Sequence, residues 1–127
     1  MILFRKLEET KLEHIKEMEI EEEAVKFFPI EVIEKNNNFV FRMDAPGLEK
    51  KNIDINIKNN IIYVSGEKVK TISEEKEDTF FTERFFGAFK RCISLPQNIN
   101  TDNITATYIN GVLEITIQKI KEKNSKY

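Results

Sequence analysis

Few side chains in this sequence have the types and spacing that catalysis or metal binding requires. Cys92 is the only cysteine and His14 the only histidine, so zinc fingers, thiol proteases and Ser-His-Asp hydrolases lack their parts. No cleft-forming acid–base pair or nucleophile emerges, and we expect no enzyme, no metal and no cofactor. Glu21-Glu22-Glu23 and Glu74-Glu75 lack the turn glycine and carbonyl ligands of a calcium loop. We interpret both runs as solvated charge.

We expect no chemical role for the single cysteine or the single histidine. A single cysteine forms no intrachain disulfide, which is compatible with a reducing compartment, and a cytoplasmic location is our expectation. The strand position of Cys92 favours a buried structural thiol over an oxidation sensor, and we interpret His14 as a bystander. No run reaches the roughly 20 apolar residues of a membrane span, and the acidic N-terminal stretch lacks the apolar region of a signal peptide.

The elements that would position a functional surface are β-hairpins, and the clearest runs from Ile104 to Ile117. Asn110-Gly111 can adopt the positive φ angles of a two-residue type I′ turn. Counting outward from this turn, one face of the hairpin is apolar and the other mostly polar, because side chains alternate along a strand. The apolar cross-strand pairs are Tyr108/Leu113, Ala106/Ile115 and Ile104/Ile117.

A second hairpin is predicted around Asn59-Asn60 by the same counting of cross-strand pairs outward from the turn. Its apolar pairs are Ile57/Ile62 and Ile55/Val64, whereas Tyr63 with Asn56 and Ser65 with Asp54 lie on the polar side. Two half-apolar hairpins cover each other when their sheets pack about 10 Å apart. The sequence therefore predicts an all-β fold, an antiparallel β-sandwich.

Length and charge are consistent with one such domain and short flanking segments. The chain has 127 residues, of which 40% are hydrophobic, and its sequence pI of about 5.6 disfavours broad binding to a phosphate backbone. We expect an N-terminal arm over residues 1–28, a sandwich domain over 29–119 and a polar tail over 120–127. The arm is helical or disordered in this prediction, because Glu9, Glu13 and Glu17 repel one another at helical spacing.

Between the two hairpins a charged stretch is followed by an aromatic one. Residues 67–78 predict a long mobile loop. Apolar character returns from Thr79 to Pro96, where Gly87 is expected to divide two strands. In the second of these, Arg91 shares a face with Phe89 and Leu95. An arginine in that position must lie at the rim of the core, pair with an acid or sit in a subunit interface.

Taken together, these residues resemble the α-crystallin domain of the small heat-shock proteins. The family's closing signature, Ala-x-x-x-(Asn/Asp)-Gly-Val-Leu, is matched by Ala106, Asn110, Gly111, Val112 and Leu113. Three further motifs stand in the family's order: Pro46-Gly47, Val64-Ser65-Gly66-Glu67, and Glu83-Arg84…Gly87-Ala88-Phe89-Lys90-Arg91…Leu95-Pro96. The resemblance covers about Pro29 to Lys119 and implies an immunoglobulin-like sandwich.

The resemblance also implies a function without catalysis. Such proteins are ATP-independent chaperones, or holdases, which bind partly unfolded clients under stress and prevent their aggregation. It further implies a homodimer, in which the strand Thr79–Arg84 pairs with the neighbour's first strand near Ile30–Glu34. The implied interface residues are Phe80, Phe81, Thr82, Glu83, Arg84 and Arg91, with the two arginines as candidates for charge pairs.

Client binding requires exposed apolar surface. The resemblance points to a groove between the strands Ile53–Lys58 and Ile104–Tyr108, with Ile55, Ile57, Ile104 and Ala106 as candidates, and plain core packing is their alternative reading. The arm tip Ile2-Leu3-Phe4 is a second candidate contact. The tail lacks the Ile-x-Ile motif that fills this groove in the family, so a dimer or a small dynamic assembly is expected.

Two other classes of function compete with the holdase. An adaptor of the CS-domain type shares the sandwich fold but recruits another chaperone, and it lacks the long loop with an exchanged strand. An RNA-binding protein is a remoter alternative, because Arg84 to Lys90 resembles the aromatic-and-basic RNP1 pattern only in part. Neither nucleic acid nor a membrane is an expected partner.

Overall fold

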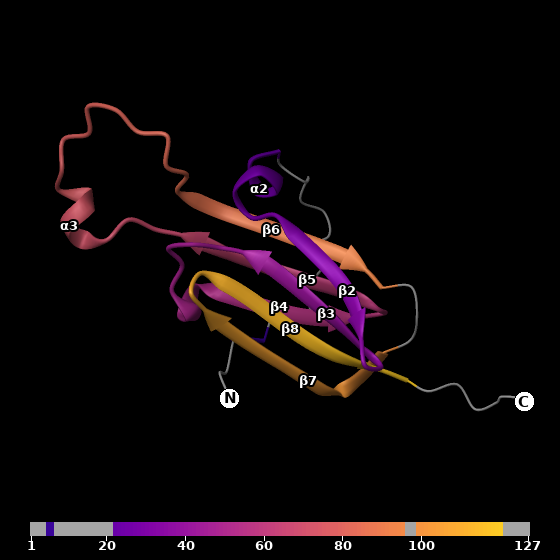
Figure 1. Ribbon diagram of the computed structural model, residues 1–127. Coiled ribbons are helices and arrows are strands. Elements are labelled where there is room, and N and C mark those ends of the chain that lie inside the picture. The colour runs from indigo at the N-terminus through magenta and orange to yellow at the C-terminus, as the bar shows by residue number, and fades with distance from the viewer. Residues whose placement is uncertain (1–4, 7–21, 96–98, 121–127) are drawn as a thin grey trace, which may run out of the picture.

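Two four-stranded sheets pack face to face, and a long loop projects from one end (Figure 1). The computed structural model describes residues 5–6, 22–95 and 99–120. The strands are β1 (Arg5–Lys6), β2 (Ile30–Lys35), β3 (Asn38–Asp44), β4 (Ile53–Lys58), β5 (Ile61–Lys68), β6 (Gly87–Ser94), β7 (Ile99–Ile109) and β8 (Val112–Lys119). Their orders in the two sheets are β1-β4-β5-β6 and β2-β3-β8-β7.

The helical elements are short. They are α2 (Glu22–Phe27), α3 (Ile72–Glu75) and a 3₁₀ turn at Lys50–Asn52 that leads into β4. Within the described ranges, no helix combines the length and the apolar character needed to cross a membrane. The sheets therefore supply the framework on which any functional surface is built.

Three hairpins close through two-residue turns in which both residues have positive φ. The turn residues are Asn36/Asn37, Asn59/Asn60 and Asn110/Gly111. Asparagine and glycine enter this region of backbone space more readily than other residues, and type I′ turns need it twice. The turns predicted at 59–60 and 110–111 are confirmed. The turn joining β2 to β3 was not predicted, although Asn36-Asn37 carries the same signal.

The predicted register of both hairpins is confirmed. Ile104 pairs with Ile117, Ala106 with Ile115 and Tyr108 with Leu113 across β7 and β8. Ile55 pairs with Val64 and Ile57 with Ile62 across β4 and β5. Because these hairpins belong to different sheets, their apolar faces oppose each other, and the antiparallel β-sandwich follows.

The core lies between the two inner faces. Its largest fully buried side chains are Phe28, Phe39, Phe41, Met43, Ile53, Ile62, Val64, Leu113, Ile115 and Ile117. The Phe28 ring stacks on that of Phe89, with centroids 4.2 Å apart. The end of the segment assigned to the N-terminal arm thus packs into the sandwich.

The outward face of the β1-β4-β5-β6 sheet is less exposed to solvent than the alternation of apolar and polar residues suggests. Asp54 and Lys90 are both buried there, and Tyr63 is only 3% exposed. Cys92, expected to be a buried thiol, is half-buried beside Tyr63. Alternation indicates which way a side chain points, but it does not indicate whether another segment covers that side.

Two sequence expectations need correction. Arg5–Lys6 form a strand, so the arm is not entirely helical or disordered. The stretch 67–78 is not all loop, because β5 continues to Lys68 and α3 forms at Ile72–Glu75. Within the described chain, no strand precedes Gly87 in residues 79–86. A strand requires a neighbour that accepts its backbone hydrogen bonds, and the described part of the chain offers none at that place.

Sequence motifs that lie far apart meet in space. The Ala45 amide, next to Pro46-Gly47, donates a hydrogen bond to the Gly111 carbonyl at 2.7 Å. A Cβ atom on Gly111 would lie 3.3 Å from the Cα of Pro46. A Cβ atom on Gly66 would lie 2.1 Å from the backbone oxygen of Asn52. Close backbone approach therefore requires glycine at position 66, whereas the positive φ and a tighter than usual contact with Pro46 favour it at position 111.

We predict that Gly66→Ala lowers the free energy of unfolding by about 3 kcal/mol, because the added methyl group meets a backbone atom that cannot rotate away. Urea denaturation followed by circular dichroism measures this change. Glu67→Ala, on the exposed neighbouring position, is the control and should stay within about 0.5 kcal/mol of the parent. Equal stabilities of the two variants would contradict the close packing of β5 on the 3₁₀ turn.

Candidate protein-interaction surface

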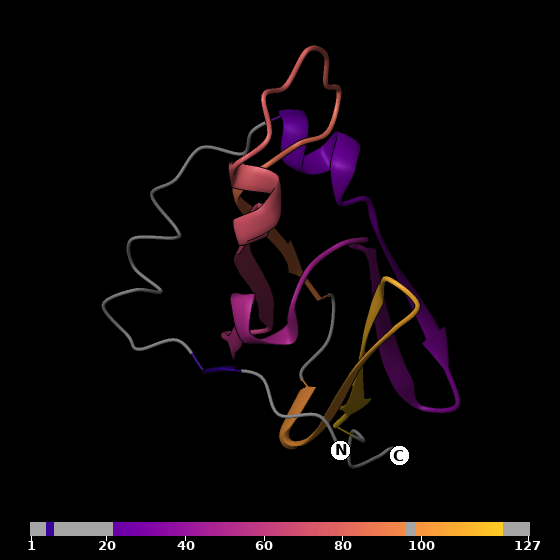
Figure 2. The same ribbon diagram turned by 90° about the vertical axis from the view of Figure 1, so that its left-hand side faces the viewer.

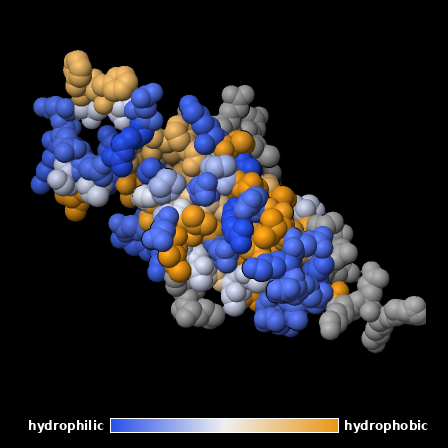
Figure 3. Space-filling view, viewed as in Figure 1, coloured by the Kyte–Doolittle hydropathy of each residue, from blue (hydrophilic) through white to orange (hydrophobic). Residues whose placement is uncertain are grey.

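The loop formed by residues 69–86 exposes large apolar side chains. Phe80 and Phe81 are 103% and 74% exposed, and Val69 and Ile72 are exposed as well. Figures 1 and 2 show the loop standing away from both sheets, and Figure 3 shows apolar side chains gathered at its tip. A phenylalanine left in water forgoes roughly 1.5–3 kcal/mol of burial free energy. This loop tip is therefore a surface suited to a partner.

A set of hydrogen bonds, which we call the loop latch, joins α3 to the far end of the loop. The Thr71 hydroxyl accepts from the Glu74 amide, and the Thr71 amide donates to Glu74 Oε1, both at 3.0 Å. Arg84 Nη1 donates to Glu74 Oε2 at 2.6 Å. The interpretation of Glu74 as solvated charge did not include these contacts, although Thr71-x-x-Glu74 carries the sequence pattern of a capping box.

The loop latch changes the acidity of its carboxylate. The hydrogen bond from the Thr71 amide, followed by those from Arg84 and from the Thr71 side chain, lowers the pKa of Glu74 to about 2. Each of these donors stabilises the ionised form. The latch is thus complete at neutral pH and holds the two ends of the loop together.

The aromatic residues that follow the loop tip are engaged within the chain. The Phe86 ring lies 4.8 Å from the Arg84 guanidinium carbon and 5.3 and 5.8 Å from the amino groups of Lys70 and Lys68. The Phe85 ring stacks on that of Phe27, with centroids 5.5 Å apart. These contacts occupy the rings that an RNP1-like motif would offer to bases.

Arg91 lies on β6 opposite Val64, which is fully buried. Its Nε and Nη1 atoms are buried, and neither has a hydrogen-bond partner in the described part of the chain. Leaving charged donors buried and unpaired is costly, by several kcal/mol. The sequence left three positions open for Arg91: the rim of the core, an ion pair with an acid, or a subunit interface. Within the described chain, Arg91 forms no ion pair with an acid.

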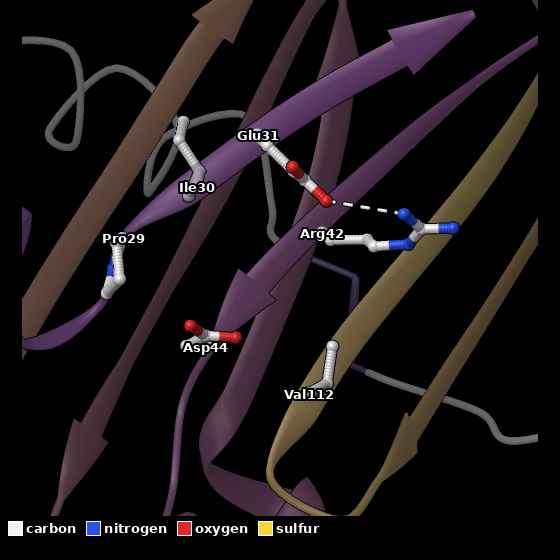
Figure 4. A pocket seen from close by; sticks show the side chains of 6 residues that line it. All are labelled: Pro29, Ile30, Glu31, Arg42, Asp44 and Val112. Atoms are coloured by element: carbon white, nitrogen blue, oxygen red, sulfur yellow. Dashed lines mark hydrogen bonds and ion pairs between the residues drawn. The ribbon is translucent and has the colours of Figure 1, made fainter.

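The strand β2 ends its sheet and pairs only with β3 within the described residues. A shallow depression beside it is lined by Pro29, Ile30, Glu31, Arg42, Asp44 and Val112 (Figure 4). Arg42 Nε donates to Glu114 at 2.9 Å and Nη1 to Glu31 at 3.3 Å, and these carboxylates raise the pKa of Arg42. The cation in this depression is already paired, so the feature open to a partner is the backbone edge of β2.

The candidate groove residues lie on two edge regions. Ile55 and Ile57 belong to β4, and Ile104 and Ala106 belong to β7; all four are half-buried and pack against the core. Their role in docking stays a prediction. Ile2, Leu3 and Phe4 lie outside the described residues. Of the predicted interface set, Phe80 to Arg84 lie together on the loop, whereas Arg91 lies in the sandwich.

Sequence reasoning did not find β1. Arg5 pairs with Asp54 and Lys6 with Ile55, so β1 lies parallel to β4. Two consecutive basic residues carry no strand signal, because a strand is recognised by alternation over at least four residues. The pairing is decided by the edge that receives it.

The latch allows a prediction about pH. Because the pKa of Glu74 is lowered from 4.5 to about 2, the stabilisation by the latch is complete above pH 4.5 and is lost as the pH falls through about 2. An NMR titration of the Glu74 carboxyl carbon should show this low midpoint. Arg84→Gln should raise the midpoint and Arg84→Lys should raise it less. A midpoint near 4.5 in the parent protein would contradict the latch.

Comparisons with known proteins agree with this arrangement. The family model of the Hsp20/alpha crystallin family matches residues 31–127. Small heat shock protein C2 of Rickettsia felis is 38% identical over 96 residues, which are 76% of this chain and 62% of that protein. The 17.3 kDa class II heat shock protein of Solanum peruvianum is 41% identical, over 77% of this chain and 64% of that protein. The matched region thus spans less than two thirds of either relative.

Solved structures show the same fold. Heat shock protein 16.0 of Schizosaccharomyces pombe superposes with a TM-score of 0.69 at 28% identity, over 79% of this chain and 93% of that one. A small heat-shock protein of Xylella fastidiosa gives a TM-score of 0.67 at 31% identity, over 79% and 92% of the two chains. That protein is described as forming a distinct high order structure. On the sequence motifs, the sandwich and these matches together, the chain belongs to the Hsp20/alpha crystallin family.

Proposed function

We propose that this protein is an ATP-independent holdase, which binds partly unfolded proteins in the cytoplasm and prevents their aggregation. The observation that supports it most directly is the pair Phe80 and Phe81, which is held at the tip of a latched loop. An apolar segment on this loop is expected of a small heat-shock protein that exchanges it between subunits, and the capture of clients by the hydrophobic effect needs no nucleotide. The relatives named heat shock proteins support the same function.

The same loop favours the holdase over an adaptor of the CS-domain type, which lacks a long loop carrying an exchanged strand. Residues 79–84 have no strand partner within the described chain, while the edge of β2 has none on its outer side. Pairing of these two elements between copies satisfies both sets of backbone groups. The proposal therefore includes a homodimer formed by exchange of Thr79–Arg84, with small dynamic oligomers built from it.

Arg91 is the charged residue that such a dimer is proposed to complete. Its buried Nε and Nη1 atoms have no partner in the described chain. An acceptor from the neighbouring subunit, with Glu83 as the first candidate, would supply one. Arg84 already binds Glu74 in its own chain, so its proposed part in the dimer is to hold the loop in position.

The holdase proposal predicts suppression of aggregation without nucleotide. Citrate synthase heated alone scatters light as it aggregates, and an equimolar amount of this protein should suppress that scattering with or without ATP. Light scattering and the mass of the soluble complex measure the effect. Undiminished scattering at an equimolar ratio, with the protein itself still folded, would refute the holdase function.

The dimer proposal predicts that Phe80→Ser combined with Phe81→Ser weakens dimerisation about 10,000-fold, since both copies lose two rings and each lost ring removes about 1.4 kcal/mol of burial. Ile72→Ser is the control, because Ile72 is as exposed as Phe81 on the same loop but lies outside residues 79–84. Analytical ultracentrifugation over a dilution series gives the dissociation constants.

A second arm of this experiment tests Arg91. Reversal of its charge in Arg91→Glu should also weaken the dimer, whereas Arg91→Lys should weaken it less. An unchanged dissociation constant in Arg91→Glu would remove Arg91 from the interface. Equal constants for the double phenylalanine variant and the Ile72→Ser control would remove the loop strand from it.

A further inference from the structure

The outer edge of β2 carries apolar residues on both of its faces. Val32 pairs with Phe41, a fully buried core residue, so Val32 lies on the inward face. Ile33 pairs with Val40 and lies on the outward face. Val32 and Ile33 are both half-buried, and Lys35, at the end of the strand, is exposed. A strand added to this edge should therefore bring an apolar residue to each face and an acid to the end.

Residues 78–81 have this composition. Phe80 and Phe81 are adjacent and exposed, so they point to opposite faces when the segment is extended. Asp78 is exposed and precedes Phe80 by two positions. Neither Asp78 nor Lys35 forms an ion pair within the described part of the chain. These two opposite charges are therefore free to pair between two copies.

One antiparallel register satisfies all of these side chains. It opposes apolar residues to apolar residues and an acid to a base, in the pairs Phe81/Val32, Phe80/Ile33 and Asp78/Lys35. A slip by one position in either direction opposes two carboxylates, in the pairs Glu83/Glu31 or Asp78/Glu34. A slip by two positions opposes a phenylalanine to Glu31 or to Glu34. The side chains of β2 thus favour a single antiparallel register.

The other end of β2 favours this register over a parallel one. In the antiparallel register Glu83 lies opposite Ile30, on the inward face of the sheet. Arg91 is also on an inward face, and its buried Nε and Nη1 atoms have no partner within the described residues. A parallel register with equally good apolar pairs places Glu83 against Lys35 instead, and Arg91 loses this acid. The antiparallel register uses both acids of the segment.

We propose that an ion pair between Asp78 of one copy and Lys35 of the other fixes this antiparallel register and selects a second copy of this chain for the β2 edge. Two-fold symmetry supplies the pair twice in a dimer. Both side chains are exposed, so the pair contributes more to selectivity than to affinity. The inference rests on the exchange of Thr79–Arg84 proposed above, and it adds the register and the charge pair to that exchange.

The test uses charge reversal in the full chain. Lys35→Glu and Asp78→Lys each oppose like charges at two places in a homodimer, and each should weaken dimerisation about tenfold. A mixture of the two variants restores both pairs, so about nine-tenths of its dimers should be heterodimers, against about half for random mixing. Native mass spectrometry with one variant labelled with ¹⁵N counts them. Lys76→Glu mixed with Glu75→Lys is the control, because these exposed loop residues lie outside the register and give the same net charges.

The possible outcomes are distinct. Random mixing of Lys35→Glu with Asp78→Lys, equal to that of the control, would overturn the proposed pair. A heterodimer preference of Lys35→Glu for Glu83→Lys would indicate the parallel register and overturn the antiparallel one. Recovery of the dissociation constant in the double variant, with random mixing of the single ones, would place the pair within one chain and also overturn it. A parent protein that stays monomeric would instead refute the dimer proposed above, and client scattering tests the holdase function separately.

Discussion

The register of the asparagine turns is the constraint on which the rest of this structure depends. Asn59/Asn60 and Asn110/Gly111 each close a hairpin with two residues of positive φ. A slip of one residue in either hairpin would move its whole apolar set to the solvent side. With the register held, Ile62 and Val64 in one sheet face Ile115 and Ile117 in the other, and all four are fully buried. Every edge of the sandwich takes its position from that packing.

A β-sandwich buries the side chains between its sheets but leaves the backbone groups of its edge strands unpaired. Each sheet ends in a strand whose outer backbone groups need a partner, and these edges are where such a fold interacts or aggregates. In this chain the β4 edge receives β1, and within the described residues the β2 edge receives nothing. The two edges therefore differ: one is occupied by a segment of the same chain, and the other is open within the described residues.

The projecting loop combines an exposed apolar tip with an ordered base. Its tip carries Phe80 and Phe81 in solvent, which is unfavourable for an isolated chain, whereas its base is ordered by Glu74 between Thr71 and Arg84. A firm base reduces the conformational entropy that a partner must remove when it binds the tip. Arg91 shows a related feature inside the sandwich, where the buried guanidinium atoms lack an acceptor within the described residues. Both features are left incomplete within the described residues, and they are the basis of the proposed dimer.

Local patterns in the sequence determined the two hairpins, their register and the inward residues of β4, β5, β7 and β8, because alternation and turn chemistry act over a few neighbouring positions. The same patterns placed Phe80 to Arg84 on one segment and Arg91 in phase with the core. They did not show that Tyr63 and Lys90 are buried on an outward face. Nor did they show that Glu74 accepts a hydrogen bond from Arg84, ten positions away. Those facts depend on which segments cover which surfaces.

Tertiary structure alone decided the pairing of β1 with β4 and the need for glycine at position 66. Arg5–Lys6 have no strand preference of their own that could be recognised, and they become a strand because an open edge lies within reach. Gly66 is required by the Asn52 carbonyl, which the fold brings to 2.1 Å from the position of a Cβ atom. Sequence thus determined what each strand buries, since that is a property of neighbours along the chain. The fold decided which strand pairs with each sheet edge and which backbone atoms contact each glycine, since those partners come from elsewhere in the chain.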